Sequence, residues 1–137
     1  MQQYTGTKVI KAKELSRGEY NNLRGWVTPS DENPDDAGYL VEYVGQGNPN
    51  HADFANYISW SPKQVFEEAY KPSGTPAERV ILEEVELERK LQKLNEFTKT
   101  SAFDLLASED RTLLRMQLEV MRTYSSILGL RIARFKV

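Results

Sequence analysis

Apolar positions change their spacing along the chain, and the change falls at a short stretch rich in proline and glycine, residues 71–76. Before it, apolar and aromatic residues alternate with turn residues, as in strands joined by polar connections. After it, leucines and charged residues recur at the spacing of amphipathic helices. The pattern predicts an α+β fold, in which a small antiparallel sheet with short helices occupies residues 1–72. A C-terminal antiparallel helical hairpin, which mediates oligomerisation, follows in residues 76–137.

In the first half, three segments have the β-branched and aromatic content of strands. They are residues 7–13, 39–44 and 57–60, and the last two form a hairpin with a long polar connection. A short helix is expected after Ser16, because Ser16 and Glu19 have the spacing of a capping box, and Gly25 ends it. A second helix is expected to begin with Ser61 as its N-cap and to end near Tyr70.

The second half predicts two helices. The first begins at Thr75, which forms a capping box with Glu78, and runs to about Thr98. The last begins with Ser108 as its N-cap. Its apolar sector, centred near Met121, covers about half of the circumference, which is more than one antiparallel partner helix covers. A homo-oligomer would bury the surplus apolar surface.

Composition limits the class of function. Hydrophobic residues make up 39% of the chain, and the formal net charge is −2, whereas proteins that coat DNA or RNA usually carry a basic excess. The chain has no cysteine, which excludes disulfides and thiolate metal sites. It has neither a signal-peptide pattern nor 18 consecutive apolar residues. We therefore expect a soluble cytosolic protein that binds neither nucleic acid nor membranes.

The sequence carries no signature of a catalytic site. A nucleophile motif, a phosphate loop and a dinucleotide-binding fingerprint are all lacking. His51 is the only histidine, and without other ligands at suitable spacing it is interpreted as a surface turn residue rather than a metal ligand. The acidic loop at 31–36 lacks the spaced oxygens of a calcium loop. These observations favour a binding protein over an enzyme, with no catalytic residue, metal or cofactor.

Arginines of the last helix are the first candidate binding residues. Arg111, Arg115 and Arg122 are four and seven residues apart, so they form one stripe at the edge of the apolar sector. A guanidinium group pairs with phosphate and stacks on rings, so this stripe suits a planar anionic ligand. The alternative is that these arginines form ion pairs with the glutamates at 83–88 of the partner helix.

Rings and a polar group close to the arginines complete this candidate site. The end of the first helix, with Asn95 and Phe97, is expected to meet the start of the last helix, with its first two arginines. Asn95 offers both a donor and an acceptor for reading a base edge. Arg122 and Tyr124 lie further along the helix, and we expect them to join the site from a neighbouring subunit.

A second candidate lies in the first half. Arg24 and Trp26 flank Gly25 at the expected end of a helix, and they could present a stacked, cationic pair at the surface. The alternative for most aromatic residues of this half is a small aromatic core.

Four segments resemble parts of small phage and prophage proteins. They are YTGTK at 4–8, YNNLRGW at 20–26, GYLVEY at 38–43 and ISWSPK at 58–63, followed by Phe66-Glu67 and Ala69-Tyr70. They are similar in particular to the N-terminal domain of the anti-Thoeris cyclic-nucleotide sponges, over roughly residues 4–70. The segment 91–97 and the helix after it resemble a C-terminal hairpin of phage accessory proteins.

The resemblance implies an antiparallel sheet followed by a helical hairpin, assembled as a dimer or hexamer. It implies that the protein sequesters cyclic ADP-ribose signals in the host cytoplasm without hydrolysing them, and some members of the family also hold cyclic oligonucleotides. Two other interpretations stay open. A protein-binding module that inhibits a host defence or metabolic protein would use the apolar hairpin and the acidic loop. A nucleotide-processing enzyme is disfavoured, because no metal cluster or catalytic dyad is visible.

Overall fold

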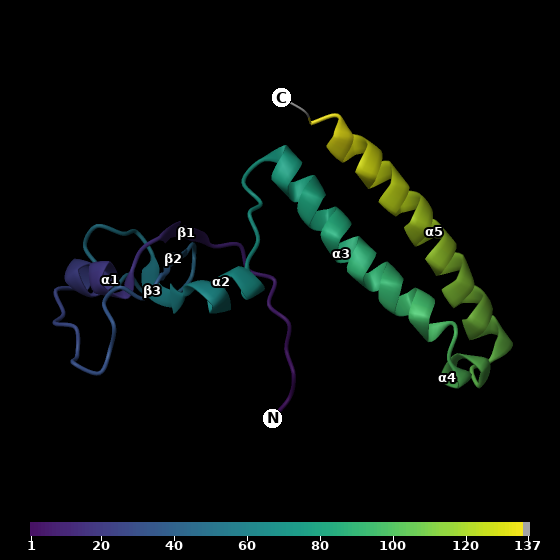
Figure 1. Cartoon of the computed structure of the whole chain (residues 1–137), viewed down its shortest axis with the longest axis horizontal. Helices are drawn as coiled ribbons and strands as arrows, with labels where there is room; N and C mark the ends of the chain where they lie inside the picture. The colour runs from purple at the N-terminus through teal and green to yellow at the C-terminus, as the bar shows by residue number, and fades with distance from the viewer. Residues whose placement is uncertain (136–137) are drawn as a thin grey trace. The chain divides into compact units, whose positions relative to one another are not determined.

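A computed structural model describes residues 1–135, and its elements follow the α+β pattern expected from the sequence (Figure 1). In chain order they are β1 (Lys11–Glu14), α1 (Arg17–Arg24), β2 (Gly38–Tyr43), β3 (Tyr57–Pro62), α2 (Lys63–Ala69), α3 (Pro76–Phe97), α4 (Ser101–Asp104) and α5 (Ser108–Ala133). The chain divides into two compact units, Met1–Tyr70 and a second one from Lys71 onward. The last two residues of the expected hairpin, 136 and 137, lie outside the described residues.

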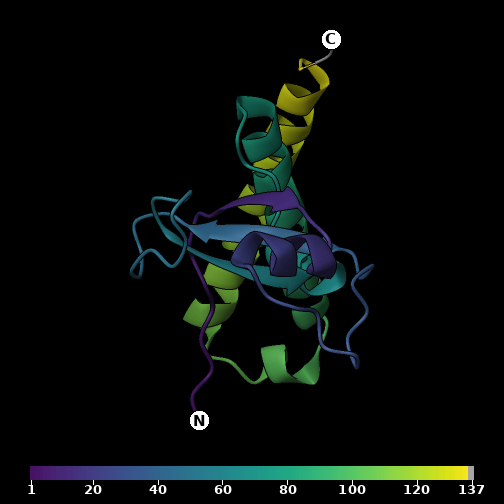
Figure 2. The same cartoon turned by 90° about the vertical axis from the view of Figure 1, so that its left-hand side faces the viewer.

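The first unit is built on a three-stranded antiparallel sheet with the order β1-β2-β3. Figure 2 shows the three strands side by side with α1 packed beside them. The pairing sets Leu40 of β2 opposite Trp60 of β3. Leu40, Ile58 and Tyr20 of α1 form the core, and Phe54 packs against it. The sheet thus holds α1 through Tyr20.

Local signals fix both ends of α1. The Ser16 hydroxyl oxygen accepts from the Glu19 N–H at 3.2 Å, and the Glu19 carboxylate accepts from the Ser16 N–H at 3.0 Å. The hydrogen bond from the Ser16 backbone holds the pKa of Glu19 below its usual value. Gly25 ends the helix with φ of 73°, a left-handed conformation that glycine adopts without strain. The helix expected from the sequence is confirmed.

Three boundaries differ from the sequence expectations. The first strand begins at Lys11 instead of residue 7. Ser61 does not cap α2, because sheet pairing continues through Pro62, which becomes the N-cap residue and provides no side-chain cap. Ser108 is already inside α5, whose N-cap is Ala107. At both Pro62 and Ala107 the N-cap residue forms no side-chain hydrogen bond to the first turn of the helix.

The second unit is a pair of helices, α3 and α5, connected through the short helix α4. The capping box expected at the start of α3 is present, with Thr75 and Glu78 bonded reciprocally. Leu91 of α3 and Leu118 and Leu128 of α5 are buried between the helices. The sequence did not predict α4, which buries Phe103 completely at the turn of the hairpin. No helix within residues 1–135 combines the length and apolarity needed to cross a membrane.

An apolar stripe on α5 remains exposed, on a different side of the helix from the buried leucines. Its members recur at steps of three and four residues, which places them along one side of a helix. We call it the α5 stripe, and its members are Leu113, Met116, Val120, Tyr124, Ile127 and Leu130. The apolar sector of α5 is therefore wider than α3 covers, as the sequence predicts.

Candidate functional site

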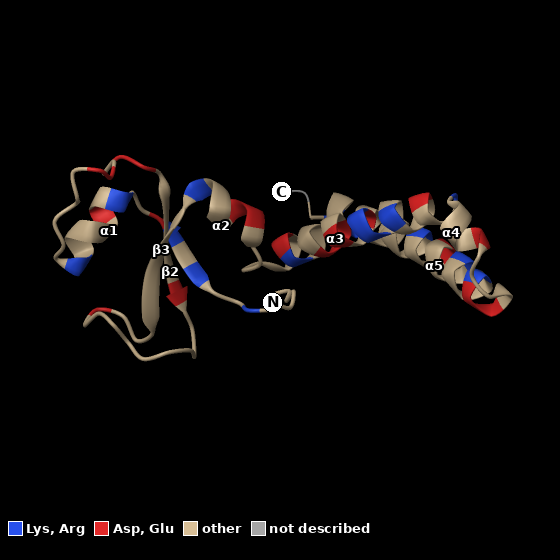
Figure 3. Cartoon of the chain, turned by 90° about the horizontal axis from the view of Figure 1, so that it is seen from below, with Lys and Arg blue, Asp and Glu red and all other residues tan. Residues whose placement is uncertain are grey.

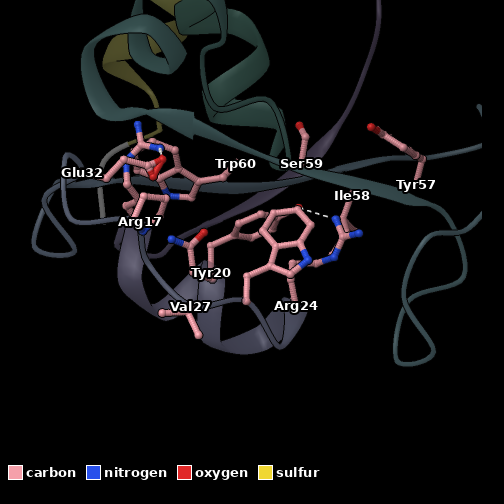
Figure 4. Close-up of a pocket in the computed structure, with 12 residues that line it drawn as sticks. Arg17, Tyr20, Arg24, Val27, Glu32, Tyr57, Ile58, Ser59 and Trp60 are labelled. Atoms are coloured by element: carbon pink, nitrogen blue, oxygen red, sulfur yellow. Dashed lines mark hydrogen bonds and ion pairs between the residues drawn. The ribbon is translucent and has the colours of Figure 1, made fainter.

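A pocket of about 500 Å³ opens in the first unit between α1, the loop that follows it, and β3 (Figure 4). Ile58 lies at its base and is fully buried, whereas Tyr20 contributes its phenol ring. Two arginine–tryptophan pairs line it, Arg24 with Trp26 and Arg17 with Trp60. The pocket therefore combines ring surfaces with two cations.

The Arg24 wall carries a positive charge that no carboxylate balances within residues 1–135. The guanidinium carbon lies 4.4 Å from the centre of the Trp26 ring, and one guanidinium nitrogen donates to the Tyr20 hydroxyl oxygen at 2.9 Å. The Tyr20 and Trp26 rings meet edge to face, with centroids 6.0 Å apart. Trp26 nevertheless stays 52% exposed. The stacked pair expected from the sequence is present.

The Arg17 wall is electrically compensated. Arg17 donates to Glu32 at 2.9 Å, and its Nε lies 3.8 Å from an Asp36 carboxylate oxygen. Its guanidinium carbon also lies 4.5 Å from the centre of the Trp60 ring. The indole N–H of Trp60 donates to the Leu15 carbonyl oxygen at 2.7 Å, which fixes the ring. The acidic loop at 31–36, which lacks the pattern of a calcium loop, is thus an ion-pair partner of α1.

Three residues that line the pocket were not expected there from the sequence: Arg17, Tyr20 and Trp60. A signal for the first was available, because the capping box places Arg17 at the start of α1 and Arg24 at its end. Seven residues are about two helical turns, so the two arginines share one side of the helix. No local signal identifies Trp60, which arrives from β3 through sheet pairing.

In the second unit, the structure brings Arg122 and Asn95 together within one chain. Arg122 donates to the Asn95 side-chain oxygen at 3.0 Å and to Glu119 at 2.6 Å. The expectation that Arg122 needs a neighbouring subunit to reach Asn95 is wrong, because the long arginine side chain spans the offset between the helices. Figure 3 shows that both helices of the hairpin carry charges of both signs.

Arg115 and Phe97 meet through a residue that the sequence analysis did not single out. The Arg115 guanidinium lies 4.9 Å from the centre of the Phe103 ring, and Phe97 packs edge to face against the same ring at 5.9 Å. Arg111 lies one turn before Arg115, and its Nε is buried without a hydrogen-bond partner among the described residues. The end of α3 and the start of α5 therefore come together around Phe103.

Tyr124 is hydrogen-bonded to α3 rather than to the other candidate site residues. Its hydroxyl donates to Glu83, and this hydrogen bond raises the pKa of Tyr124. Ser125 donates to Glu84 at 2.8 Å and lies 3.2 Å from Glu88. The alternative in which the arginines pair with the glutamates at 83–88 is not realised in the ion pairs of residues 1–135, because the hydroxyl groups of α5 occupy three of these carboxylates.

His51 has a structural role inside the first unit. Its Nδ1 accepts from the Asp53 N–H at 3.1 Å, so its Nε2 carries the proton and donates to the Leu23 carbonyl oxygen at 2.9 Å. It is half-buried rather than a free surface residue, and it ties the turn to the end of α1. Across the described part of the chain, no three histidine, aspartate or glutamate side chains are grouped as metal ligands would be.

The hairpin with its arginines and Phe103 is the part of the chain that a known family describes. Residues 75–134 match the Sequestin family. This is the family of the anti-Thoeris sponge proteins, so the suspected resemblance to these sponges is confirmed over the hairpin. The Sequestin match covers the helical hairpin, whereas the segments that resemble the sponges lie mainly in residues 4–70.

A Sequestin match indicates a sequestering protein, and the family name implies binding rather than catalysis. No curated protein and no solved structure matches the chain. The match therefore gives the general role, and the chemistry of the ligand has to be argued from the residues.

Proposed function

We propose that the protein is a phage-encoded, non-enzymatic sponge that sequesters a cyclic nucleotide signal in the host cytoplasm. The proposed ligand is of the cyclic ADP-ribose type, with cyclic oligonucleotides as a second class to be tested. The observation that carries the proposal is the Sequestin match over a hairpin whose arginines lie beside an amide and aromatic rings. Such a set suits a ligand that combines phosphates with a base.

In this proposal the start of α5 holds the phosphates. Arg111 and Arg115 are one turn apart, so a pyrophosphate can meet both guanidinium groups. The buried, unpartnered Nε of Arg111 supports this assignment, because such a donor is costly unless it gains an acceptor. Phe97 and Phe103 offer ring surface next to Arg115.

Asn95 is the proposed base-reading group, assisted by Arg122. The present contact joins the Asn95 oxygen to Arg122 and leaves the Asn95 amide donors available for a base edge. A ligand phosphate could then exchange with Glu119 on Arg122. Tyr124 is bonded to Glu83 and would join the site only after leaving that carboxylate.

We also propose that the protein assembles as a homo-oligomer, a dimer or a hexamer, through its C-terminal helices. The α5 stripe supports this, because it runs along most of a helix of 26 residues and lies on a different side of α5 from the leucines that are buried. A second copy presents the same stripe, and a two-fold pairing of like surfaces closes the assembly.

The test is calorimetry of the purified protein against cyclic ADP-ribose isomers and cyclic oligonucleotides, followed by chromatography of the ligand recovered after denaturation. Intact ligand is expected. Arg115→Ala and Arg122→Ala are expected to weaken binding about ten- to a hundredfold, because each removes a charged hydrogen bond. The matched control is Arg89→Ala, since Arg89 is bonded to Glu86 of its own helix.

Other outcomes would overturn specific parts of the proposal. Altered ligand would indicate an enzyme. If the α5 variants bind normally and Arg24→Ala does not, the site lies in the first unit. If no ligand binds, the α5 stripe favours the second candidate function, a module that docks on a host protein.

A further inference from the structure

The pocket of the first unit has an asymmetric distribution of charge. At one end, Glu32 and Asp36 compensate Arg17. At the other end, the neutral Tyr20 hydroxyl is the only hydrogen-bond partner of Arg24 among the described residues. A guanidinium group has five donors, so Arg24 can bind an anion while it keeps the bond to Tyr20. The Tyr20 hydroxyl accepts from Arg24 and retains its own hydrogen to donate to the same anion.

Trp26 supplies a ring surface next to this cation. Arg24 covers part of the indole, yet the side chain remains 52% exposed. Stacking on an exposed aromatic side chain contributes substantially to the binding of nucleobases. An aromatic ring of a ligand therefore has a place to lie beside its anionic group.

The wall that carries Trp26 is fixed before any ligand binds. The Trp26 backbone N–H donates to the Asn21 carbonyl oxygen at 2.8 Å, and the Asn21 side-chain amide donates to the Thr28 hydroxyl oxygen at 3.0 Å. Gly25 closes α1 between these residues. Because the loop is held on both sides of Trp26, binding would not have to order it.

We infer that this pocket is a binding site for a planar aromatic ring that carries one anionic group, of the purine mononucleotide class, and that it works independently of the hairpin arginines. The anion binds Arg24 and the Tyr20 hydroxyl, and the ring stacks on Trp26. The carboxylate of Glu32 disfavours a second anion at the far end and can accept from an amino group of the ring. This assignment does not depend on the proposed sponge activity.

The chain offers a selective readout for this site. Its two tryptophans, Trp26 and Trp60, both line the pocket, and the hairpin has none. Tryptophan fluorescence of the full chain is measured while AMP, adenosine or inorganic phosphate is added. AMP is expected to change the fluorescence with saturation, and adenosine and phosphate are expected to bind at least about tenfold more weakly, because each lacks one of the two contacts.

Variants separate the contacts. Arg24→Gln is expected to weaken AMP binding about ten- to a hundredfold, since it removes the charged hydrogen bond. Trp26→Leu removes the stacking surface and should weaken AMP binding, which the fluorescence of Trp60 still measures. Trp26→Phe keeps an aromatic ring and should retain part of the affinity for AMP. Arg89→Gln and Arg115→Gln are controls in the other unit and should leave the titration unchanged. Circular dichroism verifies that each variant is folded.

The inference is overturned if AMP leaves the fluorescence unchanged, or if folded Arg24→Gln binds AMP like the parent protein. Loss of AMP binding in Arg115→Gln would overturn the independence of the two sites. The sponge proposal is tested separately, by calorimetry with cyclic ADP-ribose. A negative result for AMP therefore leaves the sponge proposal untouched, and a negative result for cyclic ADP-ribose leaves the AMP site untouched.

Discussion

Asn50 closes the outer edge of β3 at Ile58. The Asn50 side-chain amide donates to the Ile58 carbonyl oxygen at 2.8 Å, and the Asn50 side-chain oxygen accepts from the Ile58 N–H at 2.8 Å. A single side chain thus reproduces the pair of hydrogen bonds that a neighbouring strand would provide. The arrangement satisfies the backbone of a fully buried residue at the base of the pocket.

Asn50→Ala should therefore destabilise the first unit. Both backbone groups of Ile58 would lose their partners, and the expected loss is about 1–3 kcal/mol of unfolding free energy. Urea unfolding followed by tryptophan fluorescence measures it, because both tryptophans lie in this unit. Asn48→Ala, at an exposed position of the same turn, is the control and should change stability little.

Gly38→Ala tests the packing of Trp60. A β-carbon at residue 38 would clash with the Trp60 ring and with the Ser61 carbonyl oxygen. Because one of these neighbours is backbone, the sheet has to shift, and we expect a loss of about 1–3 kcal/mol together with a changed tryptophan emission. Gly6→Ala meets nothing within 4 Å and should be neutral. A Gly38→Ala protein with unchanged stability would contradict the described register of β2 and β3.

Two adjacent serines of α5 give a matched pair for the hairpin. Ser125 donates across to Glu84 of α3, whereas Ser126 donates only to the Arg122 carbonyl oxygen of its own helix. Ser125→Ala leaves a partly buried carboxylate with fewer donors and should cost about 1 kcal/mol, measured by thermal unfolding with circular dichroism. Ser126→Ala should be neutral or slightly stabilising, since alanine favours helix. Equal effects would argue against this pairing of α3 and α5.

Val120→Asp tests the proposed assembly. Val120 is 67% exposed in the middle of the α5 stripe, whereas Met121 is half-buried in the chain's own hairpin. An aspartate at 120 would place an unpaired charge in a dry interface and should dissociate the oligomer, as measured by light scattering. Ser126→Asp introduces the same charge outside the stripe and should leave the assembly intact. A parent protein that is monomeric at micromolar concentration would remove the proposal.

The features that the sequence predicted correctly depend on residues close to one another along the chain. The helices α1 and α3 begin at capping boxes, whose residues are three positions apart, so their starts could be read directly. The pocket could not, because it depends on contacts such as Trp60 with the Leu15 carbonyl, which are 45 residues apart. Likewise, the contact of Arg122 with Asn95 joins residues 27 positions apart, and it depends on how α3 and α5 pack.

Helix α1 sets the distance between the two arginines of the pocket. Arg17 and Arg24 mark its two ends, and seven residues of α-helix rise about 10 Å. Caps at both ends set the length of the helix and so the separation of the two arginine Cα atoms, and each guanidinium group is held by its own partners. A small anion can reach one of them but not both. Only a ligand that spans the whole helix could also displace Glu32 from Arg17, so the pocket distinguishes ligands by their length as well as by their charge.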